Sequence, residues 1–250
     1  MHNAALAAVG LRDWRYARLP LPAELFAETV RALPAAGFRG VNVTIPHKGG
    51  ALAVADDTTP TAREIGAANT LTFESGRMLA DNTDAPGLIA ALPAGFDVSG
   101  HTALVLGAGG SARAVVWALV RAGAADVAVW NRTPERAERL AEELGARAVA
   151  APGRFDLLVN CTSVGLHDPA ATFKALPLDV DSLDAGSLVV DLVYRPGGTR
   201  LLEAARTRGA SVVDGLEILV AQGAASFERW TGMTAPRQAM REAVAPIAEP

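Results

Sequence analysis

Apolar residues in the second part of the chain occur in short runs separated by amphipathic stretches. The runs predict five buried strands, at residues 102–106, 127–130, 156–160, 188–193 and 211–213. A long helix is predicted after the first run, up to Ala122, and a polar amphipathic helix at residues 135–144. Strands that alternate with helices are typical of a parallel sheet covered on both faces, so the pattern predicts an α/β fold.

The first hundred residues mix helical and strand periods. Predicted helices lie at residues 4–9 and 22–33, and predicted strands at residues 40–44, 70–73 and 78–80. Asp84 is in position to cap a further helix, with Pro86 in its first turn. Two more helices are predicted in the tail, at residues 216–230 and 236–247. Because the pattern changes around residues 96–101, we place a domain boundary near residue 99.

The composition is that of a globular protein with one or two domains. The chain has 250 residues, of which 50% are hydrophobic and 20% charged, which is an ordinary balance. A net charge of -4 gives no indication of nucleic-acid binding, and charges interrupt every apolar run before it could span a membrane. The lone Cys161 excludes an internal disulfide, and the start has no secretion-signal pattern, so a cytoplasmic protein is expected. No metal site is predicted.

A glycine turn follows the strand predicted at residues 102–106. Gly107, Gly109 and Ala112 have the G-x-G-x-x-G/A spacing of dinucleotide-binding turns, in which backbone amides and a helix N-terminus receive the pyrophosphate. A plain tight turn is the alternative. The residues expected to contact the cofactor here are Gly107, Ala108, Gly109, Gly110, Ser111 and Ala112.

The end of the next predicted strand bears on the choice of cofactor. NAD-binding sites usually have an acidic residue there, whereas this chain has Asn131, Arg132 and Thr133, followed by Arg136. The two arginines can form charge-assisted hydrogen bonds to a 2′-phosphate, so the sequence favours NADP. Alternatively, Thr133 caps the next helix and Arg136 is a solvated helix residue.

Three polar segments of the first domain carry the candidate chemistry, at residues 42–48, 66–71 and 81–87. The chain has only two lysines, Lys48 and Lys174, beside 21 arginines. A lysine ammonium can exchange a proton, whereas an arginine guanidinium cannot. A lysine and Asp84 beside a nicotinamide suit carbonyl–alcohol interconversion. Each residue also has a plainer interpretation: Asn69 as a turn residue, Asp84 as a cap, and His47 as an exposed helix start.

Together these segments resemble those of the shikimate dehydrogenase family. The resemblance runs in order from His2 to Gly232 and includes residues 42–48, 66–71, 82–87, 107–114, 131–133, 160–165, 191–196 and 222–232. It implies NADPH-linked, reversible reduction of 3-dehydroshikimate to shikimate in aromatic amino-acid precursor synthesis. It also implies an N-terminal α/β substrate domain (1–98 with 216–250), a Rossmann-like NADP domain (99–215), and C-terminal helices that return to the first domain.

The resemblance assigns roles by position. Lys48 and Asp84 match the catalytic pair. The residues that look like substrate ligands are Asn42, Thr44, Asn69, Tyr194 and Gln222. Asn131, Arg132, Thr133 and Arg136 match the 2′-phosphate site, and the remaining cofactor contacts are Thr162, Ser163, Val193 and Gly215. Expected partners are small molecules, with neither nucleic acid nor membrane, and a homodimer is compatible with the sequence.

One feature departs from the family pattern. Members open with a strand and a Ser-x-Ser-Pro segment that leads to His-Asn, whereas here His2 and Asn3 follow Met1 directly. The serines bind the substrate carboxylate in the family, and loss of the strand would expose a sheet edge. A chain start that omits residues and a divergent dehydrogenase are both open explanations. Further alternatives are a quinate or aminoshikimate dehydrogenase, a non-catalytic NADP-binding homologue and, by architecture alone, a methylenetetrahydrofolate dehydrogenase.

Overall fold

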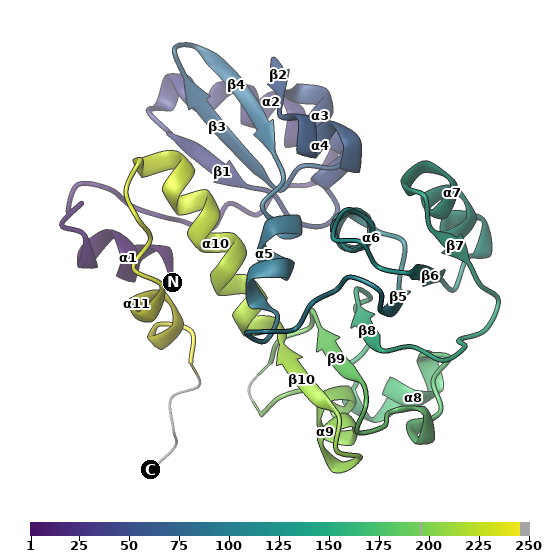
Figure 1. Ribbon diagram of the computed structural model, residues 1–250. Helices are drawn as coiled ribbons and strands as arrows, with labels where there is room; N and C mark the ends of the chain where they lie inside the picture. Colours follow the sequence, from purple (N-terminus) through teal and green to yellow (C-terminus); the bar gives the residue numbers. More distant parts are fainter. Residues whose placement is uncertain (196, 246–250) are drawn as a thin grey trace. The chain divides into compact units, whose positions relative to one another are not determined.

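The chain forms two compact units (Figure 1). The computed structural model describes residues 1–195 and 197–245. Unit 1 comprises Met1–Gly87 and Leu219–Ala245, and unit 2 comprises the described part of Leu88–Ile218. The chain passes from one unit to the other inside two helices, α5 (Asp84–Ala91) and α10 (Gly215–Thr231). The domain boundary near residue 99 stays a prediction.

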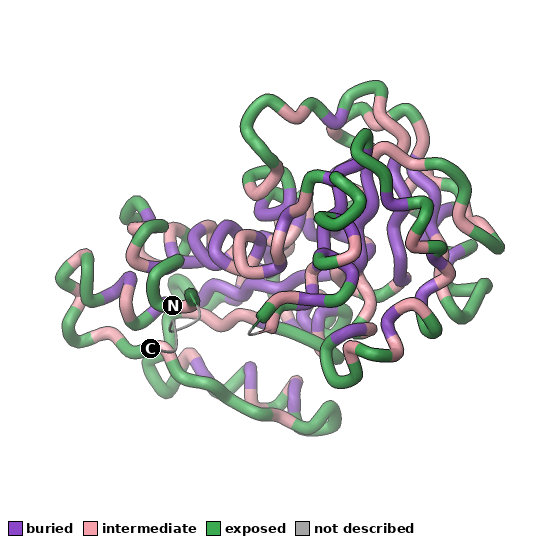
Figure 2. The backbone as a smooth tube through the Cα atoms, turned by 90° about the horizontal axis from the view of Figure 1, so that it is seen from below, coloured by how far each residue is buried: buried purple, intermediate pink, exposed green. Residues whose placement is uncertain are grey.

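Unit 2 contains a six-stranded parallel sheet in the order β10-β9-β8-β5-β6-β7, which confirms the α/β class. The strands are β5 (Thr102–Leu106), β6 (Asp126–Trp130), β7 (Arg147–Ala148), β8 (Leu157–Asn160), β9 (Leu188–Asp191) and β10 (Ser211–Asp214). The central strands are buried on both faces, as their continuous apolar runs require (Figure 2). The order reverses between β5 and β8, where ligands of such sheets bind at the carboxyl ends.

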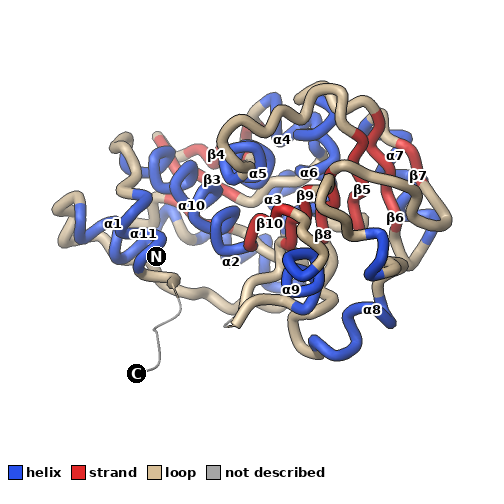
Figure 3. The backbone as a smooth tube through the Cα atoms, turned by 60° about the horizontal axis from the view of Figure 1, so that its bottom comes forward, coloured by secondary structure: helices blue, strands red, loops and turns tan. Residues whose placement is uncertain are grey.

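Helices alternate with these strands in unit 2 (Figure 3). They are α6 (Gly110–Arg121), α7 (Pro134–Leu144), α8 (Thr172–Ala175) and α9 (Arg200–Thr207), with short 3-10 turns at Pro169–Ala171 and Val180–Ser182. The polar helix α7 buries only Ala137, Leu140 and Ala141, at the spacing that its sequence predicts.

Unit 1 has a smaller mixed sheet in the order β1-β3-β4-β2. Its strands are β1 (Gly40–Asn42), β2 (Asp57–Thr58), β3 (Thr70–Glu74) and β4 (Arg77–Asp81). The β3–β4 hairpin turns at Ser75 and Gly76, both with positive φ, and pairs Thr70 with Asp81. This register brings the residues just before β3 and just after β4 to the same end of the hairpin, where two of the polar segments lie.

The helices of unit 1 follow the prediction in part. They are α1 (His2–Ala8), α2 (Phe26–Ala32), α3 (Lys48–Val54), α4 (Pro60–Ile65), the larger part of α10, and α11 (Arg237–Glu242). The helix predicted at residues 22–33 divides into a 3-10 turn, Ala23–Leu25, and α2. The last predicted helix ends at Glu242 rather than near residue 247, and its final predicted residues lie outside the described residues.

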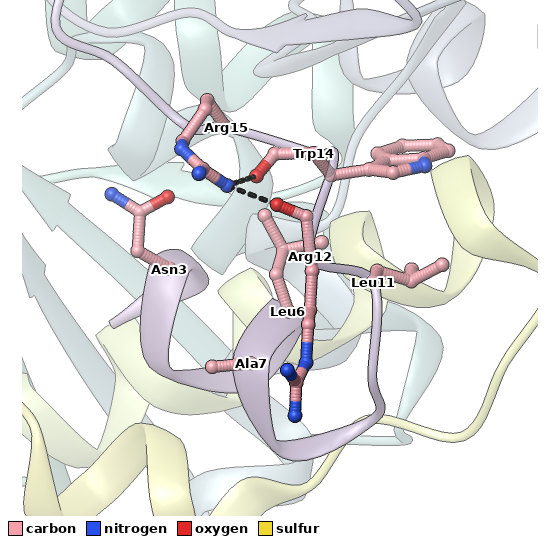
Figure 4. A pocket seen from close by; sticks show the side chains of 7 residues that line it. All are labelled: Asn3, Leu6, Ala7, Leu11, Arg12, Trp14 and Arg15. Carbon is pink, nitrogen blue, oxygen red and sulfur yellow. Dashed lines mark hydrogen bonds between the residues drawn. The ribbon is translucent and has the colours of Figure 1, made fainter.

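The outer edge of β1 borders an open groove of about 300 Å³. Residues 13–16 and 36–40 line the groove, together with Phe227 and Trp230. A second hollow, of about 510 Å³, lies between α1 and residues 11–15, where the Arg15 guanidinium bonds to the carbonyls of Arg12 and Trp14 (Figure 4). No helix in the described part of the chain is long and apolar enough to cross a membrane.

Candidate active site

Lys48 and Asp84 meet in unit 1, although 36 residues separate them. Lys48 begins α3 and Asp84 begins α5, and Lys48 Nζ donates to Asp84 Oδ2 at 2.5 Å. Their side chains are only 11% and 16% exposed, which weakens solvent screening of the pair. An ammonium and a carboxylate held in contact at a partly open position form a group that can hand over a proton.

Asn69 is the hub of the hydrogen bonds around this pair. Its side-chain amide lies 2.8 Å from Asp84 Oδ1, 3.0 Å from Thr83 Oγ1 and 3.3 Å from Gln222 Oε1. Its side-chain oxygen, Oδ1, accepts a hydrogen bond from the Thr83 backbone N–H at 2.7 Å. Asn69 is 2% exposed, and Gln222 comes from α10, so sequence-distant elements of unit 1 supply one cluster. The turn-residue interpretation of Asn69 is therefore incomplete.

Asn42, at the end of β1, contacts the same cluster from the side. Its amide lies 3.3 Å from Thr70 Oγ1, and its carbonyl oxygen accepts from the Tyr16 hydroxyl at 3.0 Å. The Tyr16 ring stacks on the His2 ring at a centroid distance of 4.2 Å. Burial lowers the pKa of His2 to about 4. Asn42 is thus fixed by a tyrosine that the sequence analysis did not single out.

The remaining predicted residues of the first domain are more peripheral. Thr44 is exposed, and its backbone carbonyl accepts a hydrogen bond from the His47 N–H at 2.8 Å. His47 caps α3 by position, as predicted, but it is not exposed, because its ring stacks on Phe26 and its Nε2 lies 3.0 Å from the Leu21 carbonyl. Lys174 is exposed in unit 2.

The prediction that Asp84 caps α5 is wrong. Asp84 is the first residue of the helix, and the capping oxygen belongs to Asn82, which accepts from the N–H groups of Asp84 and Ala85. Asp81 was also missed: its buried carboxylate lies 2.7 Å from the Arg229 guanidinium of α10. The sequence signal for Asn82 and Asp81 was the run of polar residues at the end of β4. Periodicity alone does not show which of these residues forms a turn, a cap or an ion pair.

In unit 2 the glycine turn lies at the reversal of the strand order. Leu106 of β5 is in register with Asn160 of β8, so the segments after the two strands run together. Gly107 has φ 109°, and a Cβ there would lie 3.2 Å from the Cys161 carbonyl carbon, so only glycine fits without strain. Gly109 precedes α6, and a Cβ there would meet nothing within 4 Å. Open space before a 12-residue helix is what a pyrophosphate requires.

The predicted 2′-phosphate ligands lie between β6 and the first turn of α7. Arg132, Thr133 and Arg136 are all exposed, and Asn131 donates to the Thr133 carbonyl at 2.8 Å. Thr133 is the N-cap residue of α7 by position but makes no side-chain capping bond. Two exposed guanidiniums at a helix start can bind a dianionic phosphate.

The other predicted cofactor residues follow β8 and β9 in unit 2. Thr162 donates to Asn160 Oδ1 at 2.7 Å, Ser163 is exposed, and the buried Val193 donates its N–H to Asp191 at 3.0 Å. Gly215 begins α10, and a Cβ there would lie 2.7 Å from the Leu192 carbonyl oxygen. Tyr194 is 47% exposed. The side chains of Asn160 and Asp191 therefore hold the segments that carry Thr162 and Val193.

Asp191 anchors the segment that carries Val193. Its carboxylate accepts from Asn160 Nδ2 at 2.9 Å and from Thr199 Oγ1 at 2.7 Å. Burial nevertheless raises its pKa to about 6. Among the described residues, no group of three or more His, Cys, Asp and Glu side chains is placed to hold a metal ion. A glycine turn at the switch point of a parallel sheet and a lysine–carboxylate pair are each typical of nicotinamide-dependent oxidoreductases.

Comparisons with known proteins give the family. Family models match residues 1–71 (shikimate dehydrogenase substrate binding domain), 90–160 (shikimate/quinate 5-dehydrogenase) and 215–245 (shikimate 5′-dehydrogenase C-terminal domain). The NADP(+) shikimate dehydrogenase of Thermus thermophilus is 47% identical over 245 residues, which are 97% of this chain and 90% of the relative. The chain belongs to the shikimate dehydrogenase family.

Solved structures agree with this membership. A crystal structure of Thermus thermophilus shikimate 5-dehydrogenase in complex with NADP(H) and shikimate is 46% identical, with a TM-score of 0.88, over 97% of this chain and 91% of that one. A ligand-free 5-ketofructose reductase from Gluconobacter is 35% identical, with a TM-score of 0.86, over 96% and 90%. The fold thus occurs in proteins that are named for different substrates.

Proposed function

We propose that this chain catalyses the NADPH-dependent, reversible reduction of 3-dehydroshikimate to shikimate, with Lys48 and Asp84 as its acid/base pair. The observation that carries the proposal is the 2.5 Å contact between Lys48 Nζ and Asp84 Oδ2 inside the cluster around Asn69 and Gln222. The name of the 47% identical Thermus relative and the ligands of the solved Thermus structure support the same substrate and cofactor.

The reaction needs a proton as well as a hydride. NADPH, when bound, would supply the hydride for the carbonyl carbon, and the oxygen would then need a proton to become a hydroxyl. The Lys48 ammonium donates that proton, and its amine takes the hydroxyl proton in the reverse direction. Asp84 holds the ammonium in place at 2.5 Å. Asn69 fixes the other oxygen of Asp84, so the pair has one orientation before substrate arrives.

The other proposed ligands follow from their places around this pair. Gln222 and Asn42 carry amides suited to sugar-like hydroxyl groups, and each already contacts the Asn69 cluster. Thr44 and Tyr194 are proposed ligands on the family resemblance, and their exposure leaves their hydroxyls accessible.

NADP is the proposed cofactor. Residues 107–112 would hold the pyrophosphate at the start of α6, and the exposed Arg132 and Arg136 would bind the 2′-phosphate. Thr162, Ser163, Val193 and Gly215 are the proposed further contacts. The substrate domain (1–98 with 216–250), the NADP domain (99–215), a cytoplasmic location and a homodimer are likewise proposed, and light scattering tests the last.

A second candidate is reduction of a neutral keto sugar. It is favoured by the 35% identity to a protein named 5-ketofructose reductase. Quinate is a third substrate to test, because one matching family model is described as shikimate/quinate 5-dehydrogenase. Shikimate and quinate both carry a carboxylate, whereas a keto sugar does not, so a direct comparison of rates with the three substrates separates the candidates.

The deciding experiment is the rise in nicotinamide absorbance when the purified chain meets shikimate and NADP. Formation of NADPH that is faster with shikimate than with quinate supports the proposal. Faster oxidation of NADPH by 5-ketofructose than by 3-dehydroshikimate would replace it with the second candidate. NADP binding without any turnover would indicate a non-catalytic homologue.

A further inference from the structure

Asn82 links two of the loops that form the lysine site. It is 2% exposed and lies between β4 and α5. Its side-chain oxygen accepts from the backbone N–H groups of Asp84 at 3.1 Å and Ala85 at 3.2 Å. Its side-chain nitrogen donates to the Ala67 carbonyl at 2.9 Å. One amide therefore caps the helix that carries Asp84 and ties that helix to the loop that carries Asn69.

The residues on either side of Asn82 are also held by hydrogen bonds and an ion pair. The Asp81 carboxylate accepts from Thr59 Oγ1 at 2.8 Å and from the Asn82 N–H at 2.8 Å, and it pairs with Arg229 at 2.7 Å. Thr83 donates its N–H to Asn69 at 2.7 Å. Each of the three residues before Asp84 is therefore fixed by hydrogen bonds or an ion pair, and these contacts set the direction of the Asp84 side chain.

We propose that Asn82 is a positioning residue for the Lys48–Asp84 pair. The inference rests on the proposed function of that pair. With one carboxylate oxygen of Asp84 bonded to Lys48 at 2.5 Å and the other to Asn69 at 2.8 Å, a small rotation of the first turn of α5 breaks both contacts. Asn82 does not touch substrate, because its amide is buried and both of its ends are bonded to backbone.

Three variants separate positioning from plain stabilisation. Asn82→Ala removes the cap and the bond to Ala67. Asn82→Ser restores a capping oxygen alone, since serine caps helices about as well as asparagine. Asp168→Ala is the matched control: Asp168 Oδ1 caps a 3-10 turn of unit 2 by accepting from Ala170 at 3.1 Å and Ala171 at 3.3 Å.

The first readout is kinetic. Asn82→Ala should lower kcat about 30- to 100-fold, as expected of a displaced catalytic group, while KM for shikimate and Kd for NADP change less than about threefold. Asn82→Ser should recover most of kcat. Asn82→Ala and Asp168→Ala should both lower Tm by roughly 2–6 °C, but only the first should lose turnover. A kcat for Asn82→Ala within about threefold of the parent, despite a lower Tm, overturns the proposal.

The second readout does not depend on turnover, so it separates this proposal from the proposed function. The chain has two lysines, Lys48 and the exposed Lys174. In Asn82→Ala, N-hydroxysuccinimidyl acetate should acylate Lys48 at least about fivefold faster relative to Lys174 than in the parent, because the loosened Asp84 opens the pair. If the parent is inactive with shikimate, the proposed function fails and this ratio decides; an unchanged ratio overturns the role of Asn82.

Discussion

The lysine site of unit 1 and the glycine turn of unit 2 are built in different ways. Around Lys48 and Asn69, buried side chains from α3, α5, α10 and the β3–β4 hairpin satisfy one another. Around Gly109 and Arg132 the surface is open backbone and exposed side chains. The polar groups of the first region are paired when the chain folds, whereas those of the second region remain solvated until a ligand binds.

Substitutions in the two regions should therefore affect stability and ligand binding differently. A buried polar network loses stability and geometry together when one member is removed, because the partners left behind are unsatisfied. An exposed phosphate-binding residue can be removed with little effect on folding, since its interactions form only with the ligand. Four predictions test this contrast.

Lys48→Met should lower kcat about 10³-fold or more while leaving the Kd for NADP nearly unchanged. It should also lower Tm, because the partly buried Asp84 carboxylate loses its partner. Lys174→Met, at the exposed lysine of unit 2, is the control and should change neither quantity. Steady-state kinetics with a cofactor titration decide the matter, and near-normal turnover of Lys48→Met would remove Lys48 from the mechanism.

Acid should affect the two units in opposite directions. The folded pKa of His2 is about 4, below its ordinary 6.5, so its contribution of about 3 kcal/mol is present above pH 6.5 and is lost as pH falls through 4. The folded pKa of Asp191 is about 6, above 3.8, so its contribution is present below pH 3.8 and is lost as pH rises through 6.

His2→Phe keeps a ring to stack on Tyr16 and cannot titrate. Its free energy of unfolding should therefore decline less between pH 6.5 and 4 than that of the parent, as measured by urea denaturation at each pH. Identical pH slopes in the two proteins would show that His2 does not control the acid response of unit 1.

Arg132→Ala should weaken NADP binding about 10- to 100-fold by removing a charge-assisted bond to the 2′-phosphate, while NAD binding changes less than about twofold. Tm should stay the same, since Arg132 is exposed. Arg139→Ala, at another exposed arginine of α7, serves as the control. Calorimetric titration measures each affinity, and equal losses for both cofactors would contradict the assignment.

Two glycine-to-alanine substitutions compare the two regions by adding a single methyl group to each. At Gly87 a Cβ would lie 2.8 Å from Gln222 Cβ, so Gly87→Ala should cost about 1–3 kcal/mol and raise KM for shikimate by displacing Gln222. At Gly109 the Cβ meets nothing, so Gly109→Ala should fold normally and bind NADP more weakly. Thermal melts and cofactor titration compare the two, and a reversed pattern would contradict the description of both regions.

The sequence predicts those parts of the fold that depend on local pattern. The continuous apolar runs that become β5, β6, β8, β9 and β10 are visible without a structure, and so is the glycine turn after β5. The strands β2 and β7 were missed because each has only two residues, Asp57–Thr58 and Arg147–Ala148, too few to show a period.

The lysine site is less accessible to prediction. Its members could be chosen by residue type and resemblance, but the contact of Lys48 with Asp84 depends on how α3 and α5 pack, which no local pattern specifies. The prediction of Asp84 as the cap failed for a related reason, since Asn82, two positions earlier, is an equally good capping residue. Tyr16 and Arg229 carry no local signal at all, because their roles depend on distant partners.

The packing of the first residues has a practical consequence for producing the protein. His2 is 5% exposed and stacks on Tyr16, and the end of the Met1 side chain lies against Gly223 of α10. Residues attached before Met1 therefore lie one position from a buried side chain of unit 1. An exopeptidase that trims such residues should stall at His2, whose side chain is packed in the fold.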